Sequence, residues 1–197
     1  MTASADNPLR SMRVLLCVTG GIACYKAADL TSKLVQSGAV VNVAMTDAAG
    51  EFVRPLTFQA LTRGKVYQSL WEATEQYDST HLSLTESADL MVVAPATANM
   101  LAKMAHGLAD DLVSTLALSA CGACDILVAP AMNTRMWEAS ATQANMTTLR
   151  ERGVHVVGPG EGNLACGTTG LGRMADVPEI LETITRLLDG KTPKRPA

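Results

Sequence analysis

Three side chains in this sequence have the types that carry out acid–base and carboxylate chemistry. Cys166 stands between Ala165 and Gly167 in a glycine-rich stretch, where no apolar core is expected to bury a thiol. Asn133 follows an apolar run as Pro-Ala-Met-Asn, and its uncharged amide both donates and accepts hydrogen bonds. His81 lies in Asp-Ser-Thr-His-Leu-Ser-Leu and can exchange protons near neutral pH. Spacing alone leaves a structural role open for Asn133 and His81.

Asn99 repeats the setting of Asn133, because it also follows an apolar run, in Ala-Pro-Ala-Thr-Ala-Asn. An amide at such a place can hold a carboxylate or read the edge of a heterocyclic ring. The alternative for each is to cap a loop. Two amides at strand ends of one sheet are harder to explain by capping alone.

A pair of glycines marks a candidate phosphate site. Thr19-Gly20-Gly21-Ile22-Ala23 closes one apolar run and opens a helical one, and a helix N-terminus offers free N–H groups to an anion. The full G-x-G-x-x-G spacing is missing, so a dinucleotide is not indicated. Thr46 offers a hydroxyl to a mononucleotide phosphate, whereas Asp47 is interpreted as the N-cap of the following turn rather than as a ribose-binding acid. A plain strand-to-helix turn is the alternative for the glycines.

The other cysteines and histidines are interpreted as structural. Cys17 lies in an apolar run and is expected in the core. Cys121 and Cys124 form one C-x-x-C without a second pair to complete a zinc site, so they too are expected in the core, and no metal is expected. His106 is placed at the end of a helical run and His155 at the start of a strand.

These residues need a scaffold that brings strand ends together. The apolar pattern predicts strands at 13–19, 40–46, 90–94, 126–129 and 154–157. It predicts helices at 23–37, 56–62, 141–152 and 178–188, and helical segments within 97–120. Alternating strands and helices indicate a single-domain, doubly wound parallel α/β sheet, a Rossmann-like three-layer sandwich of the flavodoxin type. Ligands of such sheets bind outside the carboxyl ends of the strands, where the candidate residues are expected.

One domain is expected over residues 12–189, with predicted disorder at 1–11 and 190–197. Residues 159–174 contain five glycines and no apolar periodicity, which predicts a long, mobile flap. A net charge of −3 disfavours a nucleic-acid partner. There is no apolar run of about 18 residues and no apolar signal segment, so no membrane association is expected. An odd number of cysteines, five, indicates a reducing cytoplasm.

Together, the motifs resemble those of the flavin-dependent cysteine decarboxylases. The matching segments lie between Arg13 and Met174: Gly-Gly-Ile-Ala-Cys-Tyr-Lys, His-Leu-Ser-Leu, Ala-Pro-Ala-Thr-Ala-Asn, Gly-Leu-Ala-Asp-Asp-Leu, Pro-Ala-Met-Asn-Thr-Arg-Met-Trp and Leu-Ala-Cys-Gly…Gly-Leu-Gly-Arg-Met. Pro-Ala-Met-Asn followed by Ala-Cys-Gly is the most specific part. The chain departs from the family pattern at Thr168, where an acid is usual, and at Cys24, where alanine is common.

The resemblance implies FMN as the cofactor, bound by Gly20, Gly21, Ile22, Thr46, Ala96, Thr97, Ala98, Asn99 and Ala131. It implies His81 as catalytic base or orienting group, Asn133 as ligand of the substrate carboxylate, and Cys166 as proton donor. Met132 and Ala165 are implied to contact the substrate beside Asn133 and Cys166. A homotrimer or a multiple of it, with the flavin site between subunits, is implied as well.

The implied activity is decarboxylation of a small molecule, 4′-phosphopantothenoylcysteine, to 4′-phosphopantetheine in coenzyme A biosynthesis. Oxidation of the cysteinyl C–S bond to a thioaldehyde makes the carboxylate β to a C=S sink, and loss of CO2 leaves an enethiol to be reduced. Bifunctional relatives carry a ligase domain after the decarboxylase. This chain ends before such a domain, so we expect another protein to supply the ligase step.

Three related functions are the alternatives. An oxidative decarboxylase of peptidyl cysteine stops at the enethiol and typically lacks the Ala-Cys-Gly segment. A flavin prenyltransferase lacks the Pro-Ala-Met-Asn run. A non-enzymatic flavoprotein that regulates a phosphatase carries a long acidic tail, whereas this chain ends in Gly-Lys-Thr-Pro-Lys-Arg-Pro-Ala.

Overall fold

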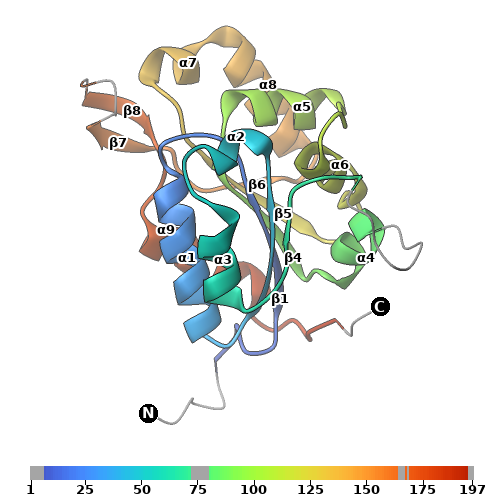
Figure 1. Ribbon diagram of the computed structural model, residues 1–197. Coiled ribbons are helices and arrows are strands. Elements are labelled where there is room, and N and C mark those ends of the chain that lie inside the picture. The colour runs from blue at the N-terminus through green and yellow to red at the C-terminus, as the bar shows by residue number, and fades with distance from the viewer. Residues whose placement is uncertain (1–6, 72–79, 164–166, 168, 195–197) are drawn as a thin grey trace.

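A six-stranded parallel sheet forms the centre of the molecule (Figure 1). The computed structural model describes residues 7–71, 80–163, 167 and 169–194. The strands lie in the order β3-β2-β1-β4-β5-β6, the Rossmann order. Their bounds are β1 Arg13–Val18, β2 Val40–Met45, β3 Val66–Tyr67, β4 Leu90–Ala96, β5 Asp125–Pro130 and β6 His155–Val156. The predicted doubly wound α/β sheet is confirmed.

Helices cover both faces of the sheet and complete the three layers (Figure 1). The helices α1, α3 and α9 share one buried cluster with the sheet, and α4, α5, α6 and α8 share the other. Within the described residues the bounds are α1 Cys24–Gln36, α2 Asp47–Gly50, α3 Pro55–Thr62, α4 Thr80–Ser87, α5 Ala98–His106, α6 Leu112–Ser119, α7 Thr134–Glu138, α8 Ser140–Glu151 and α9 Val177–Leu188.

Strand β1 shows why its sequence is apolar throughout. Val14, Leu16 and Val18 pack into the cluster with α1 and α9, whereas Leu15 and Cys17 pack into the cluster with α5 and α6. Successive side chains of a strand point to opposite faces, so a strand covered on both faces needs apolar residues at every position. Cys17 is fully buried as predicted, and burial raises the pKa of its thiol.

The predicted helical segment at 97–120 contains two helices. Gly107 follows α5 with a φ of +70°, in the left-handed region that ends helices. Asp111 then caps α6, because its side chain accepts from Ser114 N and the Ser114 hydroxyl accepts from Asp111 N. Lys103 pairs with both Asp110 and Asp111 at 2.6 Å and thereby ties the end of α5 to the start of α6.

The glycine-rich segment at 159–174 is more regular than predicted. It contains an antiparallel hairpin of β7 Gly160–Asn163 and β8 Thr169–Arg173 rather than a continuous loop. The sequence did not indicate these strands, because backbone hydrogen bonds form the pairing and the glycines leave no alternating apolar pattern.

Parts of both chain ends are held against the domain in place of the predicted disorder. Leu9 is 2% exposed within the core, and Asn7 Nδ2 donates to Ser37 O at 2.8 Å. At the other end, Lys194 N donates to Asp89 Oδ1 at 2.9 Å, and Lys194 Nζ donates to Ala123 O at 2.7 Å. In the described parts of the chain, no helix is both long and apolar enough to cross a membrane.

The prediction that Cys121 and Cys124 lie in the core is wrong for Cys121, which is exposed. Cys124 is half-buried and packs against the cluster that contains α5 and α6, and burial raises the pKa of its thiol. Both lie in the turn between α6 and β5, where Gly122 has a φ of +79°. The spacing of the cysteines did not indicate this difference between them.

Asp89 joins the start of β1 to the C-terminal segment, and its removal is expected to weaken the fold. This buried carboxylate accepts from Arg13 N at 2.7 Å and from Lys194 N at 2.9 Å. Asp89→Ala leaves both N–H groups without this acceptor and should lower the free energy of unfolding by about 1–3 kcal/mol. Asp89→Asn keeps one carbonyl oxygen and should lose less. Urea unfolding followed by circular dichroism measures both, and unchanged stability of Asp89→Ala would contradict the assignment.

Candidate functional site

The carboxyl ends of β1, β2, β4 and β5 meet at one edge of the sheet, and most of the predicted site residues follow them. Gly20 follows β1, Thr46 follows β2, Thr97 follows β4 and Ala131 follows β5. The strand order runs outward from β1 to β3 on one side and from β4 to β6 on the other. The boundary between β1 and β4 is therefore the topological switch point, where ligands of such sheets bind.

The Thr19 hydroxyl joins the ends of β1 and β4. It donates to Pro95 O at 2.6 Å and accepts from Thr97 N at 3.1 Å, and Thr19 is 1% exposed. Since α1 begins shortly after Thr19 and α5 begins directly after Thr97, the bridge places two helix N-termini side by side. Their partial positive charges add at this point of the edge.

The turn before α1 leaves backbone donors available. Ala23 occupies the N-cap position of α1 and provides no side-chain cap. Among the described residues, no backbone partner accepts from the N–H groups of Gly20, Gly21 or Ile22. Unsatisfied N–H groups at a helix N-terminus are a ready site for an anion such as a phosphate.

The two glycines of this turn have different structural reasons. A Cβ on Gly20 would lie 2.5 Å from Ala48 Cβ and 2.8 Å from the Ala48 carbonyl carbon, so close packing against α2 excludes a side chain. A Cβ on Gly21 would meet only Thr97 Cγ2, at 3.9 Å. Gly21 therefore borders open space, which is the cradle that a phosphate group needs, and the residues present fit such a group.

Two threonine hydroxyls complete the polar lining of this edge. Thr46 caps α2 by accepting from Ala49 N at 3.3 Å, and Thr97 caps α5 by accepting from Met100 N at 3.3 Å. A hydroxyl that accepts one hydrogen bond keeps its own proton to donate. The prediction that Asp47 is the N-cap is wrong, because Thr46 holds that position and Asp47 is the first residue of α2.

Cys24, the departure from the usual alanine, adds a bond to the same turn. Its thiol donates to Thr19 O at 3.2 Å and is fully buried. Burial raises the pKa of the Cys24 thiol, so the thiol stays protonated at neutral pH. Cys24 therefore supports the strand-to-helix turn from within.

The two asparagines differ in their settings. Asn99 is exposed inside the first turn of α5, where Thr97 already provides the cap. Asn133 is the N-cap of α7, and its Oδ1 accepts from Met136 N at 2.8 Å. The capping alternative is thus observed for Asn133. The same bond commits Oδ1 inward and leaves Nδ2 as a donor toward solvent.

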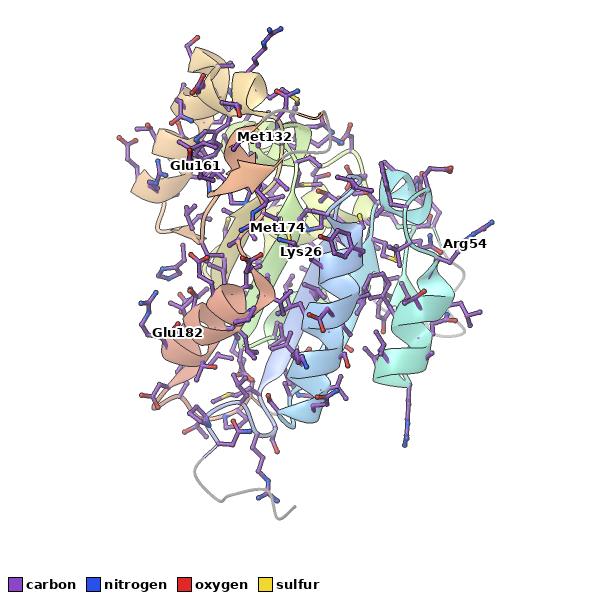
Figure 2. All side chains as sticks on the ribbon, turned by 90° about the vertical axis from the view of Figure 1, so that its left-hand side faces the viewer. Lys26, Arg54, Met132, Glu161, Met174 and Glu182 are labelled. Atoms are coloured by element: carbon purple, nitrogen blue, oxygen red, sulfur yellow. The ribbon has the colours of Figure 1, made fainter. Side chains whose placement is uncertain are left out.

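The loop from Ala131 to Asn133, here called the Asn133 loop, is bonded to the end of β4, which the Thr19 hydroxyl joins in turn to the end of β1. Ala131 N donates to Ala96 O at 3.0 Å, which holds the loop after β5 against the residue that precedes Thr97. Met132, the next residue, donates from its N to Gly172 O in β8 at 2.9 Å. The loop therefore lies between the end of β4 and the hairpin, and Figure 2 shows Met132 close to this hairpin.

Lys26 holds the base of the hairpin and was missed from the sequence. Its Nζ donates to Met174 O at 3.1 Å, and Figure 2 shows the two residues close together. Lys26 also pairs with Asp176 at 2.9 Å, and Arg173 pairs with Asp176 at 2.9 Å. Hydrogen bonding from Lys26 lowers the pKa of the Asp176 carboxyl. The one available signal was the position of Lys26 at the end of Gly-Gly-Ile-Ala-Cys-Tyr-Lys.

For three predicted site residues, the structure does not describe the side chain. Ala165 and Cys166 lie outside the described residues, as does Thr168. His81 is the second residue of α4, but its side chain is outside the description. Their roles stay predictions.

Comparison with known proteins assigns the family. The chain matches the flavoprotein family model over residues 2–189 and belongs to that family. It is 46% identical over 174 residues to the coenzyme A biosynthesis bifunctional protein CoaBC of Bacillus subtilis, which covers 88% of this chain and 42% of the relative. It is 42% identical over 176 residues to a probable phosphopantothenoylcysteine decarboxylase of Streptococcus mutans, covering 89% of this chain and 98% of the relative. The chain thus spans less than half the length of the bifunctional relatives it matches.

Solved structures agree with the fold and the cofactor class. A mutant of PPC decarboxylase complexed with pantothenoylaminoethenethiol superposes with a TM-score of 0.83 at 29% identity, covering 92% of this chain and all of the other. The FMN binding protein AtHal3 gives 0.80 at 30% identity, covering 93% of this chain and all of that one. The FMN-dependent cysteine decarboxylase SpaF gives 0.77 at 31% identity, covering 91% and 97%.

Proposed function

We propose that this chain binds FMN and decarboxylates 4′-phosphopantothenoylcysteine to 4′-phosphopantetheine, the phosphopantothenoylcysteine decarboxylase step of coenzyme A biosynthesis. One observation carries the proposal: an open turn suited to a phosphate follows β1, and the bond from Ala131 N to Ala96 O ties the loop that leads to Asn133 to the end of the neighbouring strand β4. The Streptococcus mutans relative, matched over nearly its whole length, supports the substrate.

The residues that would hold FMN lie along the carboxyl edge. The N–H groups of Gly21 and Ile22 and the hydroxyls of Thr46 and Thr97 provide donors for a single phosphate. Ala96–Asn99 and Ala131 follow the neighbouring strand ends and would flank the ring. When bound, FMN supplies the two-electron oxidation of the substrate C–S bond and the later return of hydride.

Asn133 is proposed to hold the substrate carboxylate. Its Oδ1 accepts from Met136 N, so Nδ2 is the atom that would donate to the carboxylate. A neutral donor orients a carboxylate without the strong ion pair that would stabilise it against loss of CO2. Asn133 therefore serves two purposes: it begins α7, and it presents one donor at a defined position.

His81 and Cys166 are proposed for the proton transfers, as base or orienting group and as the final acid. The solved neighbour with pantothenoylaminoethenethiol is a cysteine-to-serine mutant, and this supports a cysteine that acts after CO2 has left. A homotrimer, or a multiple of it, in the cytoplasm is proposed together with the activity. Exposed Ile22 and Tyr25 beside the cofactor turn, each 61% exposed, support a subunit contact there.

The direct test incubates purified holoprotein with 4′-phosphopantothenoylcysteine and analyses the product by mass spectrometry. The thiol formed by loss of CO2 supports the proposal. The enethiol as the final product would favour the alternative function, oxidative decarboxylation of a peptidyl cysteine. No turnover by protein that is folded and loaded with FMN would favour a binding-only flavoprotein.

The glycine pair gives a prediction that separates folding from cofactor binding. Gly21→Ala fills open space and should keep the unfolding free energy while lowering the FMN retained on purification. Gly20→Ala meets Ala48 and should destabilise the protein by about 1–3 kcal/mol. The ratio of flavin to protein absorbance and urea unfolding of the apoprotein measure the two effects. Full FMN occupancy in Gly21→Ala would contradict the proposal that the phosphate binds in the open space at Gly21.

Asn133→Asp should abolish turnover and leave the fold intact. Aspartate caps a helix as well as asparagine does, so α7 keeps its N-cap. The new carboxylate repels the substrate carboxylate at contact distance. Steady-state rates and thermal unfolding of the FMN-loaded variant measure both effects. Asn133→Ala is the control that loses the cap without adding charge, and near wild-type turnover by Asn133→Asp would remove Asn133 from the site.

Cys166→Ser should oxidise and decarboxylate the substrate but stall before the final reduction. CO2 loss needs the C=S sink, and only the later step needs an acid. A thiol with a pKa near its ordinary value of ~8.5 delivers a proton at neutral pH, whereas a serine hydroxyl is far too weak an acid. Mass spectrometry should detect an enethiol that is two hydrogens, or about two mass units, lighter than the normal product. Formation of the reduced thiol at the normal rate would show that Cys166 is not the donor.

A further inference from the structure

Strand β8 lies directly against the loop that carries Asn133. Met132 N donates to Gly172 O at 2.9 Å, so the contact is between backbones. Gly170 and Gly172 are two residues apart in β8 and face the same side of it. A Cβ on Gly172 would lie 2.2 Å from Met132 O, and a Cβ on Gly170 would lie 2.5 Å from Thr134 Oγ1.

At position 172, this contact leaves no room for any residue other than glycine. Its φ of +136° is in the region that side chains disfavour, and the nearest obstacle is a backbone oxygen that cannot rotate away. At Gly170 the obstacle is a side-chain hydroxyl, which is buried and without a hydrogen-bond partner among the described residues. The loop from Met132 to Thr134 is thus held on one side by close packing against β8.

The amide of Asn133 is oriented by two supports. Inside α7, Met136 N fixes its Oδ1. Outside α7, β8 holds the residue immediately before it, because Met132 N donates to Gly172 O. If β8 withdraws, the cap bond remains, but Met132 loses its backbone partner and the direction of Nδ2 changes with it.

We propose that Gly172 is a positioning residue for Asn133, so that β8 takes part in the oxidation and decarboxylation of the substrate, before the final reduction. This rests on the proposed function, in which Asn133 binds the substrate carboxylate. An alanine at this position forces β8 away from Met132 by about 1 Å or more, and a misplacement of that size costs on the order of 10²-fold in rate.

The matched control is a second glycine of the same hairpin. Gly162, in β7, also has a positive φ, of +157°, but a Cβ there meets the side chain of Arg173 at 3.1 Å and does not face the Asn133 loop. Gly162→Ala therefore adds the same methyl group to the same hairpin without disturbing Met132. A difference between the two variants reports the contact and not general damage to the hairpin.

Two readouts test the proposal on FMN-loaded protein. Hydrogen exchange at the Met132 amide, followed by mass spectrometry without substrate, should be faster in Gly172→Ala and unchanged in Gly162→Ala. In an anaerobic single turnover, reduction of the flavin by 4′-phosphopantothenoylcysteine should slow on the order of 10²-fold in Gly172→Ala and stay within about twofold in Gly162→Ala.

Other outcomes overturn the proposal. Normal flavin reduction with an accumulating enethiol in Gly172→Ala would mean that β8 acts only in the final reduction. Unchanged exchange at Met132 would mean that the contact does not depend on Gly172. If the wild-type flavin is not reduced, the proposed function fails, and the exchange experiment still decides whether β8 holds the loop.

A second pair of variants applies if Gly172→Ala does not fold. Gly170→Ala should slow flavin reduction because of Thr134 Oγ1, and Gly170→Ala combined with Thr134→Ala, which removes that hydroxyl, should restore it. A slow reaction in both would overturn the proposal, because the loss would then not arise from the contact with the loop.

Discussion

The bridge from the Thr19 hydroxyl to the end of β4 is the interaction on which the site depends. One buried hydroxyl donates to Pro95 O and accepts from Thr97 N, so it satisfies two backbone groups where β1 and β4 diverge. It thereby fixes the N-termini of α1 and α5 next to each other. The open turn at Gly21, the cap at Thr97 and the loop that Ala131 holds against Ala96 all take their places from this joint.

Glycines near the site serve three different purposes. Gly20 allows the turn to pack against Ala48, and Gly21 leaves space open in front of the α1 N-terminus. Gly172 lets a strand of the hairpin contact the backbone of the Asn133 loop. Only Gly21 borders the space where the proposed phosphate would bind. A glycine-rich sequence therefore indicated a functional edge, while the packing partners decide what each glycine does.

Asn133 shows how a structural and a chemical role can share one side chain. Asparagine and aspartate cap helices about equally well, so the start of α7 does not explain the choice between them. The proposed function gives a reason for the amide, because Nδ2 of an asparagine can donate to a substrate carboxylate and an aspartate cannot. The cap also reduces the conformational freedom of the side chain, which limits the entropy lost on binding.

The sequence by itself determined the class of fold, the positions of the buried strands and the polar residues at their ends, because apolar periodicity and glycine turns report burial and local geometry. It did not determine that Thr46 rather than Asp47 caps α2, that Cys121 is exposed, or that β7 and β8 pair as a hairpin. Nor did it indicate the bridge from Thr19 to Thr97 or the pair of Lys26 with Asp176, which join residues far apart in the chain. These features belong to the tertiary structure, because backbone hydrogen bonds carry no side-chain signature and long-range pairs depend on which strands become neighbours.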